Sequence, residues 1–159
     1  MQFAKDSFYA ALRDRLALIN PARTIVVNGV VRPAIVVDEN EAGDVSTLDG
    51  TFRLLWGECS AVGGGSGLTK MTCTIEYVTR GVDTTGGDRG RTLGTLDGEL
   101  LAISLPPRTW KNDFTKVPAA SLGTMVFWTD LEFGKPNDEA GRLSRKATTT
   151  VYFVNEVKP

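Results

Sequence analysis

The chain has 159 residues and a formal net charge of -1, with 42% hydrophobic and 23% charged residues. These values are typical of one globular domain that buries its own core, and they predict a single domain over residues 1–159. The near-zero charge gives no global attraction to nucleic acid, and no apolar run reaches the roughly 20 residues of a membrane span. We therefore expect no membrane partner and no sequence-specific nucleic-acid binding.

The start of the chain and its two cysteines bear on the compartment. The segment from Met1 to Asp6 lacks the basic region and the apolar block of a secretory signal, which predicts a cytoplasmic protein. Cys59 and Cys73 flank a glycine-rich turn at residues 63–67, so strand pairing would bring them nearly opposite each other. We expect two reduced thiols in strand positions, with a cross-strand disulfide as the alternative.

The first predicted element is an amphipathic helix that begins at Asp6 or Ser7 and ends near Ile19. Residues 13–15 are expected to face away from the core. The apolar stripe at helical spacing consists of Phe8, Leu12, Leu16 and Ile19.

A β-hairpin is predicted next, at residues 24–27 and 30–37. Both runs are rich in β-branched residues, and the Asn28-Gly29 dipeptide between them favours a two-residue turn with positive φ at both positions. Pro33 has no N–H to donate to a neighbouring strand, so it predicts an edge strand or a bulge.

Two longer strands are predicted at residues 52–59 and 68–80. In the second strand, Met71, Cys73 and Ile75 alternate with polar residues, which indicates one buried and one solvated face in an antiparallel sheet. Residues 81–90 are rich in glycine and aspartate and are expected to be mobile.

A second amphipathic helix is predicted over about residues 91–105. Gly94 and Gly98 lie one turn apart within it, and each costs about 1 kcal/mol relative to alanine in a helix interior. We expect these glycines to allow the close approach of a neighbouring element. The apolar stripe of this helix consists of Leu93, Leu96, Leu100 and Ile103.

The C-terminal part predicts a long connection followed by two strands. Residues 108–120 have no clear periodicity and carry Trp110, and long connections of this kind often serve a partner. Residues 123–133 and 145–154 alternate as strands and enclose a polar loop at 134–144. Together the elements predict an α+β fold: a mainly antiparallel β-sheet of about five to six strands, with the N-terminal helix and the second helix packed on one face.

The residues with chemical potential match no catalytic pattern. The chain has no histidine, which excludes Ser-His-Asp and Cys-His catalysis. The GGGSG run at residues 63–67 is followed by Leu68-Thr69-Lys70, whereas a phosphate loop ends in Gly-Lys-[Ser/Thr]. We therefore predict no catalytic residue, no cofactor and no metal site.

Charge is distributed unevenly along the chain. One loop is wholly acidic and carries Asp38, Glu39, Glu41, Asp44 and Asp49. The last predicted hairpin is mostly basic and carries Lys135, Arg142 and Arg145, next to Lys146. We hypothesise that copies of the protein meet head to tail, with the acidic loop of one copy on the basic hairpin of the next. The alternative is that both loops are simply solvated.

Trp110 lies in a polar connection, and two roles remain open for it. It packs back on its own domain, or it anchors an interface, where tryptophan is enriched.

The order of elements resembles that of the tail terminator and tail completion proteins of long-tailed bacteriophages. The resemblance covers nearly the whole chain and is one of pattern, without a diagnostic motif. It is carried by FYAALRDRL at residues 8–16, RPAIVV at 32–37, the strand at 71–80 followed by the helix at 93–105, and TTTVYFV at 148–154.

This resemblance implies a structural virion protein: a ring, usually of six copies, that caps the tail tube, ends tube polymerisation and forms the head–tail joining interface. It implies as partners the protein itself, the tail tube protein and a head-completion or connector protein, with assembly in the host cytoplasm. The alternatives are another phage neck or baseplate component, and a non-viral ligand-binding α+β domain with a pocket between the second helix and the sheet.

Overall fold

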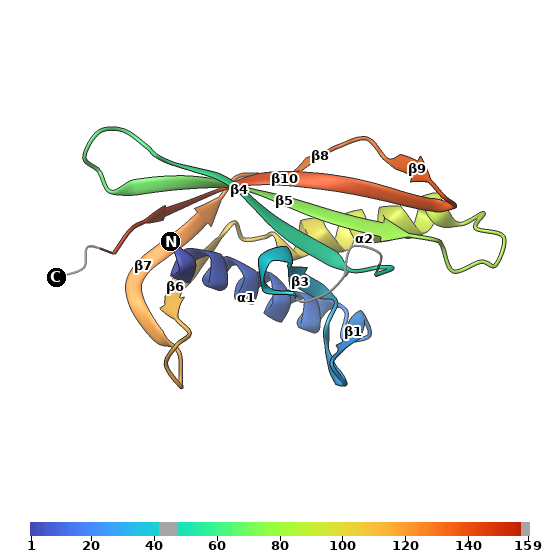
Figure 1. The fold of residues 1–159 in the computed structure, drawn as a ribbon, viewed down its shortest axis with the longest axis horizontal. Coiled ribbons are helices and arrows are strands. Elements are labelled where there is room, and N and C mark those ends of the chain that lie inside the picture. Colours follow the sequence, from blue (N-terminus) through green and yellow to red (C-terminus); the bar gives the residue numbers. More distant parts are fainter. Residues whose placement is uncertain (42–47, 157–159) are drawn as a thin grey trace.

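A computed structural model describes residues 1–41 and 48–156. It shows an α+β fold built from two helices, α1 and α2, and a mixed sheet (Figure 1). In chain order the elements are α1 (Gln2–Ile19), β1 (Thr24–Val27), β2 (Val30–Pro33), β3 (Ile35–Val37), the 3-10 helix η1 (Asp38–Asn40), β4 (Phe52–Ala61), β5 (Leu68–Thr79), α2 (Arg89–Ile103), β6 (Arg108–Asp113), β7 (Ala120–Trp128), β8 (Glu132–Phe133), β9 (Asn137–Glu139) and β10 (Arg142–Val154).

The main sheet has eight strands, more than the five to six expected. Six of them follow the order β3-β4-β5-β10-β7-β6, and β8 and β9 pair with β10 beside this path. All these pairs are antiparallel except β3–β4, which is parallel. Strands β1 and β2 form a separate two-stranded sheet.

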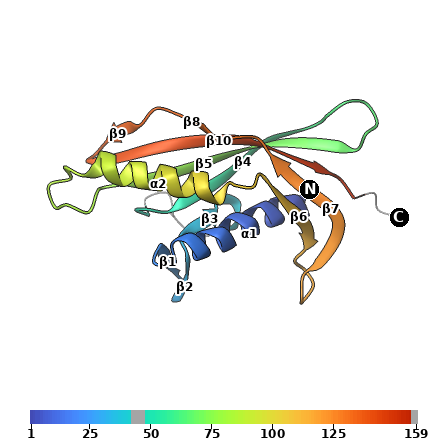
Figure 2. The ribbon, with the colours of Figure 1, turned by 180° about the vertical axis from the view of Figure 1, so that it is seen from behind.

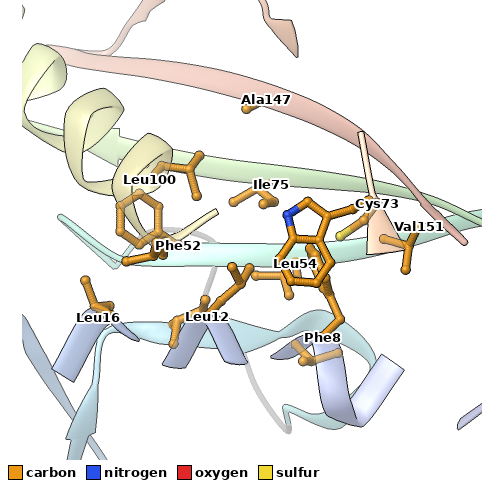
Figure 3. Close-up of a cluster of buried hydrophobic side chains, with 14 of the residues drawn as sticks. Phe8, Leu12, Leu16, Phe52, Leu54, Cys73, Ile75, Leu100, Ala147 and Val151 are labelled. Atoms are coloured by element: carbon orange, nitrogen blue, oxygen red, sulfur yellow. The ribbon is translucent and has the colours of Figure 1, made fainter. Parts of the chain in front are cut away.

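Both helices contribute to one core on one face of the main sheet, as the sequence predicts (Figures 1 and 2). Phe8, Leu12 and Leu16 of α1 point toward Phe52 and Leu54 of β4 (Figure 3). All five side chains are at most 1% exposed, and burial of each contributes roughly 1.5–3 kcal/mol. The stripe of α2 closes the same core over β5 and β10.

Helix α1 begins at Gln2, so the expected start at Asp6 or Ser7 is wrong. The Ser7 hydroxyl does not cap the helix, because it donates to the carbonyl of Phe3 at 2.6 Å and accepts from the N–H of Asn112 in β6 at 2.9 Å. The apolar stripe also begins earlier, at Ala4, and Ile19 lies outside it at 48% exposed.

Arg15 does not face away from the core as expected. Its guanidinium donates to the carbonyls of Ile103, Pro106 and Arg108 at 2.9–3.0 Å and stacks over the Trp128 ring at 5.4 Å. It thereby ties α1 to the end of α2 and the start of β6. Desolvation by burial lowers the pKa of this guanidinium.

The β-branched run at residues 30–37 divides between two sheets. Asn28 and Gly29 both have positive φ, which confirms the predicted turn, and β2 ends at Pro33. Ala34 then joins the sheets: its N–H donates to the carbonyl of Arg23, and its own carbonyl accepts from the N–H of Phe52. Strand β3 continues beside β4 as the first strand of the main sheet.

Cys59 and Cys73 are both free thiols in strands. They do not lie opposite each other, because a register shift between Trp56 and Cys59 pairs Cys73 with Trp56 and Cys59 with Met71.

A carboxylate accepts main-chain hydrogen bonds in the segment before α2, while the mobility of residues 81–90 stays a prediction. Asp88 accepts from the main-chain N–H groups of Val82 and Asp83 at 3.0–3.1 Å, and these bonds lower its pKa. Gly81 has φ +81°, and a side chain there would collide with the Asp88 carboxylate.

Among residues 1–41 and 48–156, no neighbouring element comes close to Gly94 or Gly98 of α2. A Cβ added at either position meets nothing within 4 Å, and both residues are exposed.

The predicted connection at residues 108–120 contains an edge strand, β6. The predicted strand at 123–133 divides into β7 and β8, and the predicted polar loop at 134–144 contains β9 and the start of β10. At this division the Thr129 hydroxyl accepts from the N–H of Thr150 at 3.0 Å, and the register against β10 shifts by one residue.

Candidate interaction surfaces

Within the described residues, no three His, Cys, Asp or Glu side chains gather closely enough to hold a metal ion. The same part of the chain contains no helix long and apolar enough to cross a bilayer. The remaining candidates for a functional site are charged and apolar patches on the surface.

Most acids of the predicted acidic loop are engaged within the chain. Asp49 accepts from the N–H of Arg80 at 2.8 Å, and Asp44 lies outside the described residues. The remaining three form ion pairs: Asp38 with Arg53, Glu39 with Lys5, and Glu41 with Arg32. Asp38 and Glu39 nevertheless keep 50% and 48% of their side chains exposed, so each is accessible to a second partner.

The three predicted basic residues do not form one surface. Lys135 is exposed, and Arg142 is half-buried in β10. Arg145 points to the helix side of the sheet, where it pairs with Asp97 of α2 at 3.1 Å. Asp97 also accepts a hydrogen bond from the Tyr77 hydroxyl. Burial is the larger cause that raises the pKa of this phenol, and the hydrogen bond to Asp97 is the second. Arg145 is therefore already used inside the domain, while the head-to-tail contact stays a prediction.

A groove of about 340 Å³ lies where β4, β5, β9 and β10 meet. Three charged side chains of this groove, Arg53, Glu76 and Lys146, lie on the sheet face opposite the helices. Glu76 forms ion pairs with Arg53 at 3.3 Å and with Lys146 at 3.1 Å. Arg142 also lines this groove, as does the buried Thr51 hydroxyl, which has no hydrogen-bond partner in the described part of the chain.

The pocket that the ligand-binding alternative requires, between α2 and the sheet, is filled by packed side chains. The four apolar residues of the α2 stripe are at most 2% exposed.

Trp110 does not pack back on the domain, because 57% of it is exposed. It lies on edge strand β6 directly opposite Met125 of β7, while Phe127 of β7 lies opposite Tyr152 of β10. Opposite residues of an antiparallel pair share a face, and so do alternate residues of one strand, so these four side chains lie on one face of the sheet across three strands. We call Trp110, Met125, Phe127 and Tyr152 the aromatic face.

The aromatic face points away from the core. The residues that alternate with it, Val126 and Phe153, are at most 1% exposed, whereas Phe127 is 47% exposed. Large exposed aromatic side chains that gather on one surface are typical of interaction sites.

A second apolar surface lies on the β1–β2 hairpin. Val26 and Val31 are directly opposite each other on one face of the hairpin and are 65% and 66% exposed. Val30, which is 61% exposed, lies opposite Val27 on the other face. We call Val26 and Val31 the valine hairpin. In both views the hairpin and the β6–β7 pair project on the side of the sheet that carries α1, with α1 between them (Figures 1 and 2).

Sequence reasoning identified Trp110 and missed the other residues of both surfaces. One signal was present: residues 125–128 are all apolar, so any strand there carries apolar side chains on both faces.

Comparison with known proteins shows the fold alone. No protein-family model and no curated protein matches the chain. Several chains of solved structures match, and one of them is 12% identical with a TM-score of 0.56, in a match that covers 99% of this chain and 97% of that one. At this identity the likeness concerns the arrangement of helices and strands.

Proposed function

We propose that the protein is a structural virion protein: a subunit of the tail terminator ring of a long-tailed bacteriophage. The ring caps the tail tube, ends tube polymerisation and forms the head–tail joining interface. The observation that carries this proposal is the aromatic face, which lies toward the β6 edge of the sheet and leaves Trp110 57% and Phe127 47% exposed. A subunit that has to associate with copies of itself and with other proteins needs such a surface.

The order of the elements supports the same proposal, since it resembles the order in tail terminator proteins. The proposed partners are other copies of the chain in a hexameric ring, the tail tube protein, and a head-completion or connector protein. Assembly takes place in the host cytoplasm, and the ring remains in the virion. This role requires no catalytic step from the protein.

Another neck or baseplate component is a second candidate, because the same surfaces would serve any subunit of a tail. The groove beside Arg142 favours a third candidate, a small ligand-binding domain. Its ion-paired lining weakens that candidate, since a ligand would have to displace Glu76 from Arg53 or from Lys146.

Native mass spectrometry over a range of protein and salt concentrations, together with negative-stain electron microscopy, tests the proposal. We expect a closed ring of about six copies with a central channel. Adding the ring to growing tail tubes separates the first two candidates, because a terminator binds one tube end and stops extension. A chain that remains monomeric with and without tubes would overturn the proposal.

A further inference from the structure

The groove between β4, β5, β9 and β10 contains an arginine without a counter-charge. Arg142 lines it from the first position of β10, and among residues 1–41 and 48–156 its guanidinium has no ion-pair partner. Glu139, directly opposite it in β9, also lines the groove but forms no ion pair in that part of the chain. A guanidinium in this state is suited to an anionic group, which it binds through two parallel N–H donors.

Lys146 can add a second positive charge at the same place. Alternate residues of a strand share a face, so Arg142 and Lys146 flank Ser144 on one face of β10, two residues away on either side, and all three line the groove. Side chains as long as arginine and lysine can both reach a group that lies over Ser144. The Ser144 hydroxyl, whose hydrogen bond to the carbonyl of Asn137 is long at 3.4 Å, can donate to that group as well.

The ion pair that a ligand has to displace here is weak. Lys146 pairs with Glu76 at 3.1 Å, but the Lys146 side chain is 70% exposed, and ion pairs at such positions contribute little to stability. Glu76 keeps its ion pair with Arg53 when Lys146 turns to a ligand. An incoming anion therefore replaces one exposed carboxylate contact of Lys146 and supplies a first one to Arg142.

The rest of the groove indicates a ligand larger than its charged group. Val78, directly opposite Ser144, and Ala140 add apolar surface to the lining. Thr51 is 3% exposed, and its unpartnered hydroxyl in the described part of the chain can be satisfied by a polar atom at the bottom of the groove. The volume of about 340 Å³ lies in the range of small-molecule sites and exceeds what a carboxylate or phosphate alone fills.

We infer that this groove binds a small organic molecule that carries a carboxylate or phosphate group. The anionic group lies over Ser144 between Arg142 and Lys146, and the uncharged body of the molecule lies along Val78 toward Thr51. This inference goes beyond the proposed function and does not depend on it, because all residues of the groove belong to one chain.

Phenyl phosphate and benzoate are the probes, since each joins an anionic group to an apolar ring, and benzyl alcohol is the uncharged control. Saturation-transfer-difference NMR at neutral pH and constant ionic strength measures their binding to the full chain, whether it is a monomer or a ring. We expect saturable binding of at least one anion, with a Kd on the order of 1 mM for a molecule of about ten non-hydrogen atoms. The anion that binds more tightly identifies the preferred charged group.

Two variants locate the site. Arg142→Gln and Lys146→Gln each remove one charge and keep a polar side chain at a position that is not buried, so far-UV circular dichroism should match wild type. R142Q is expected to weaken anion binding at least about tenfold, the loss of a charge-assisted hydrogen bond, and K146Q at least about threefold. Lys135→Gln removes a charge from an exposed position outside the groove and is the matched control, with binding equal to wild type.

Several results would overturn the inference. They are an absence of saturable binding for both anions, binding of benzyl alcohol as tight as that of the anions, wild-type affinity in R142Q or K146Q, or a loss in K135Q as large as that in R142Q. Ring formation is measured separately by native mass spectrometry. A monomeric protein that binds phenyl phosphate would therefore overturn the ring and support the groove, and a ring that binds neither anion would do the reverse.

Discussion

The ammonium group of Lys111 in β6 contacts the carboxylate of Glu156 and the main-chain carbonyl of Val154. Lys111 is 1% exposed, so this is a charged group buried inside the domain. Strands β6 and β10 are not neighbours, because β7 lies between them. The contact therefore crosses β7 and fixes the segment after β10 to the edge of the sheet.

Removing one partner of this pair is expected to destabilise the fold. Glu156→Gln leaves the buried ammonium without its counter-charge, at a cost of about 1–3 kcal/mol, less than a fully buried pair because the Glu156 side chain is 32% exposed. Lys111→Met with Glu156→Gln replaces the pair by neutral groups and is expected to recover part of that loss. Urea unfolding measures both. A midpoint for E156Q equal to that of wild type would contradict the expectation.

The same pair predicts a pH dependence. Burial alone raises the pKa of the Glu156 carboxyl, but hydrogen bonds from Lys111 and from its own N–H outweigh burial and lower the pKa overall. A lowered pKa in the folded state adds stability that is present above the unfolded value, about 4.3, and is lost as the pH falls through the folded value. The free energy of unfolding of wild type should therefore fall more steeply below about pH 4 than that of E156Q. Parallel curves for the two proteins would contradict this assignment.

Alanine at Gly94 or Gly98 is expected to stabilise the monomer. An added Cβ meets open space at both positions, so each substitution gains helix propensity of about 0.5–1 kcal/mol. Gly81→Ala is the opposite control, because φ +81° and the Asp88 carboxylate oppose a side chain there. Thermal unfolding measures all three. A loss of stability at Gly94 would show that the substituted helix does not keep its position.

The two thiols are expected to differ in reactivity. Cys59 is exposed, whereas Cys73 is 0% exposed and burial raises its pKa, which suppresses the reactive thiolate. A maleimide reagent should add once to the folded protein and twice after denaturation, as measured by mass spectrometry. Cys59→Ser should remove the fast addition, and two fast additions to the folded wild type would show that Cys73 is accessible.

Phe8 is expected to be the most sensitive position of α1. Its ring packs edge-to-face against Trp128 at 5.0 Å and against Trp56 at 5.5 Å. Phe8→Ala removes both contacts and leaves a cavity, at a cost of about 3–5 kcal/mol. Leu18→Ala, at an 82% exposed position of the same helix, is the control and should change the free energy of unfolding little. Similar losses for the two variants in chemical denaturation would contradict the expectation, because alanine raises helix propensity at both positions and only Phe8 is buried.

Periodicity in the sequence predicted the α+β class, both helices and the long strands, because their buried positions are apolar and regularly spaced. Periodicity failed to predict β6, because the buried positions of this strand, Lys111 and Asp113, are charged residues. A buried charge satisfied by a distant partner such as Glu156 leaves no trace in a local pattern.

Two further differences between the predicted and the observed strands depend on contacts between residues that are far apart in the sequence. The transfer of the chain at Ala34 from the hairpin to the main sheet requires hydrogen bonds to Arg23 and to Phe52. The separation of β7 from β8 coincides with a one-residue shift in register against β10, where the hydroxyl of Thr129 accepts from the N–H of Thr150. Of the candidate site, Trp110 was predictable from its polar surroundings, whereas its neighbours on the aromatic face are set by strand register.

Strand β10 has a consequence for how the chain acquires its structure. It lies between β5 and β7, yet β5 ends at Thr79 and β10 begins at Arg142. The β4–β5 and β6–β7 hairpins can each form from local sequence, but the sheet becomes continuous only when β10 inserts between them. Closing so long a loop is slow compared with forming a hairpin. Until insertion, β5 and β7 both present open edges, so the newly made chain is most vulnerable to aggregation at that stage, and a chaperone that shields strand edges would act there.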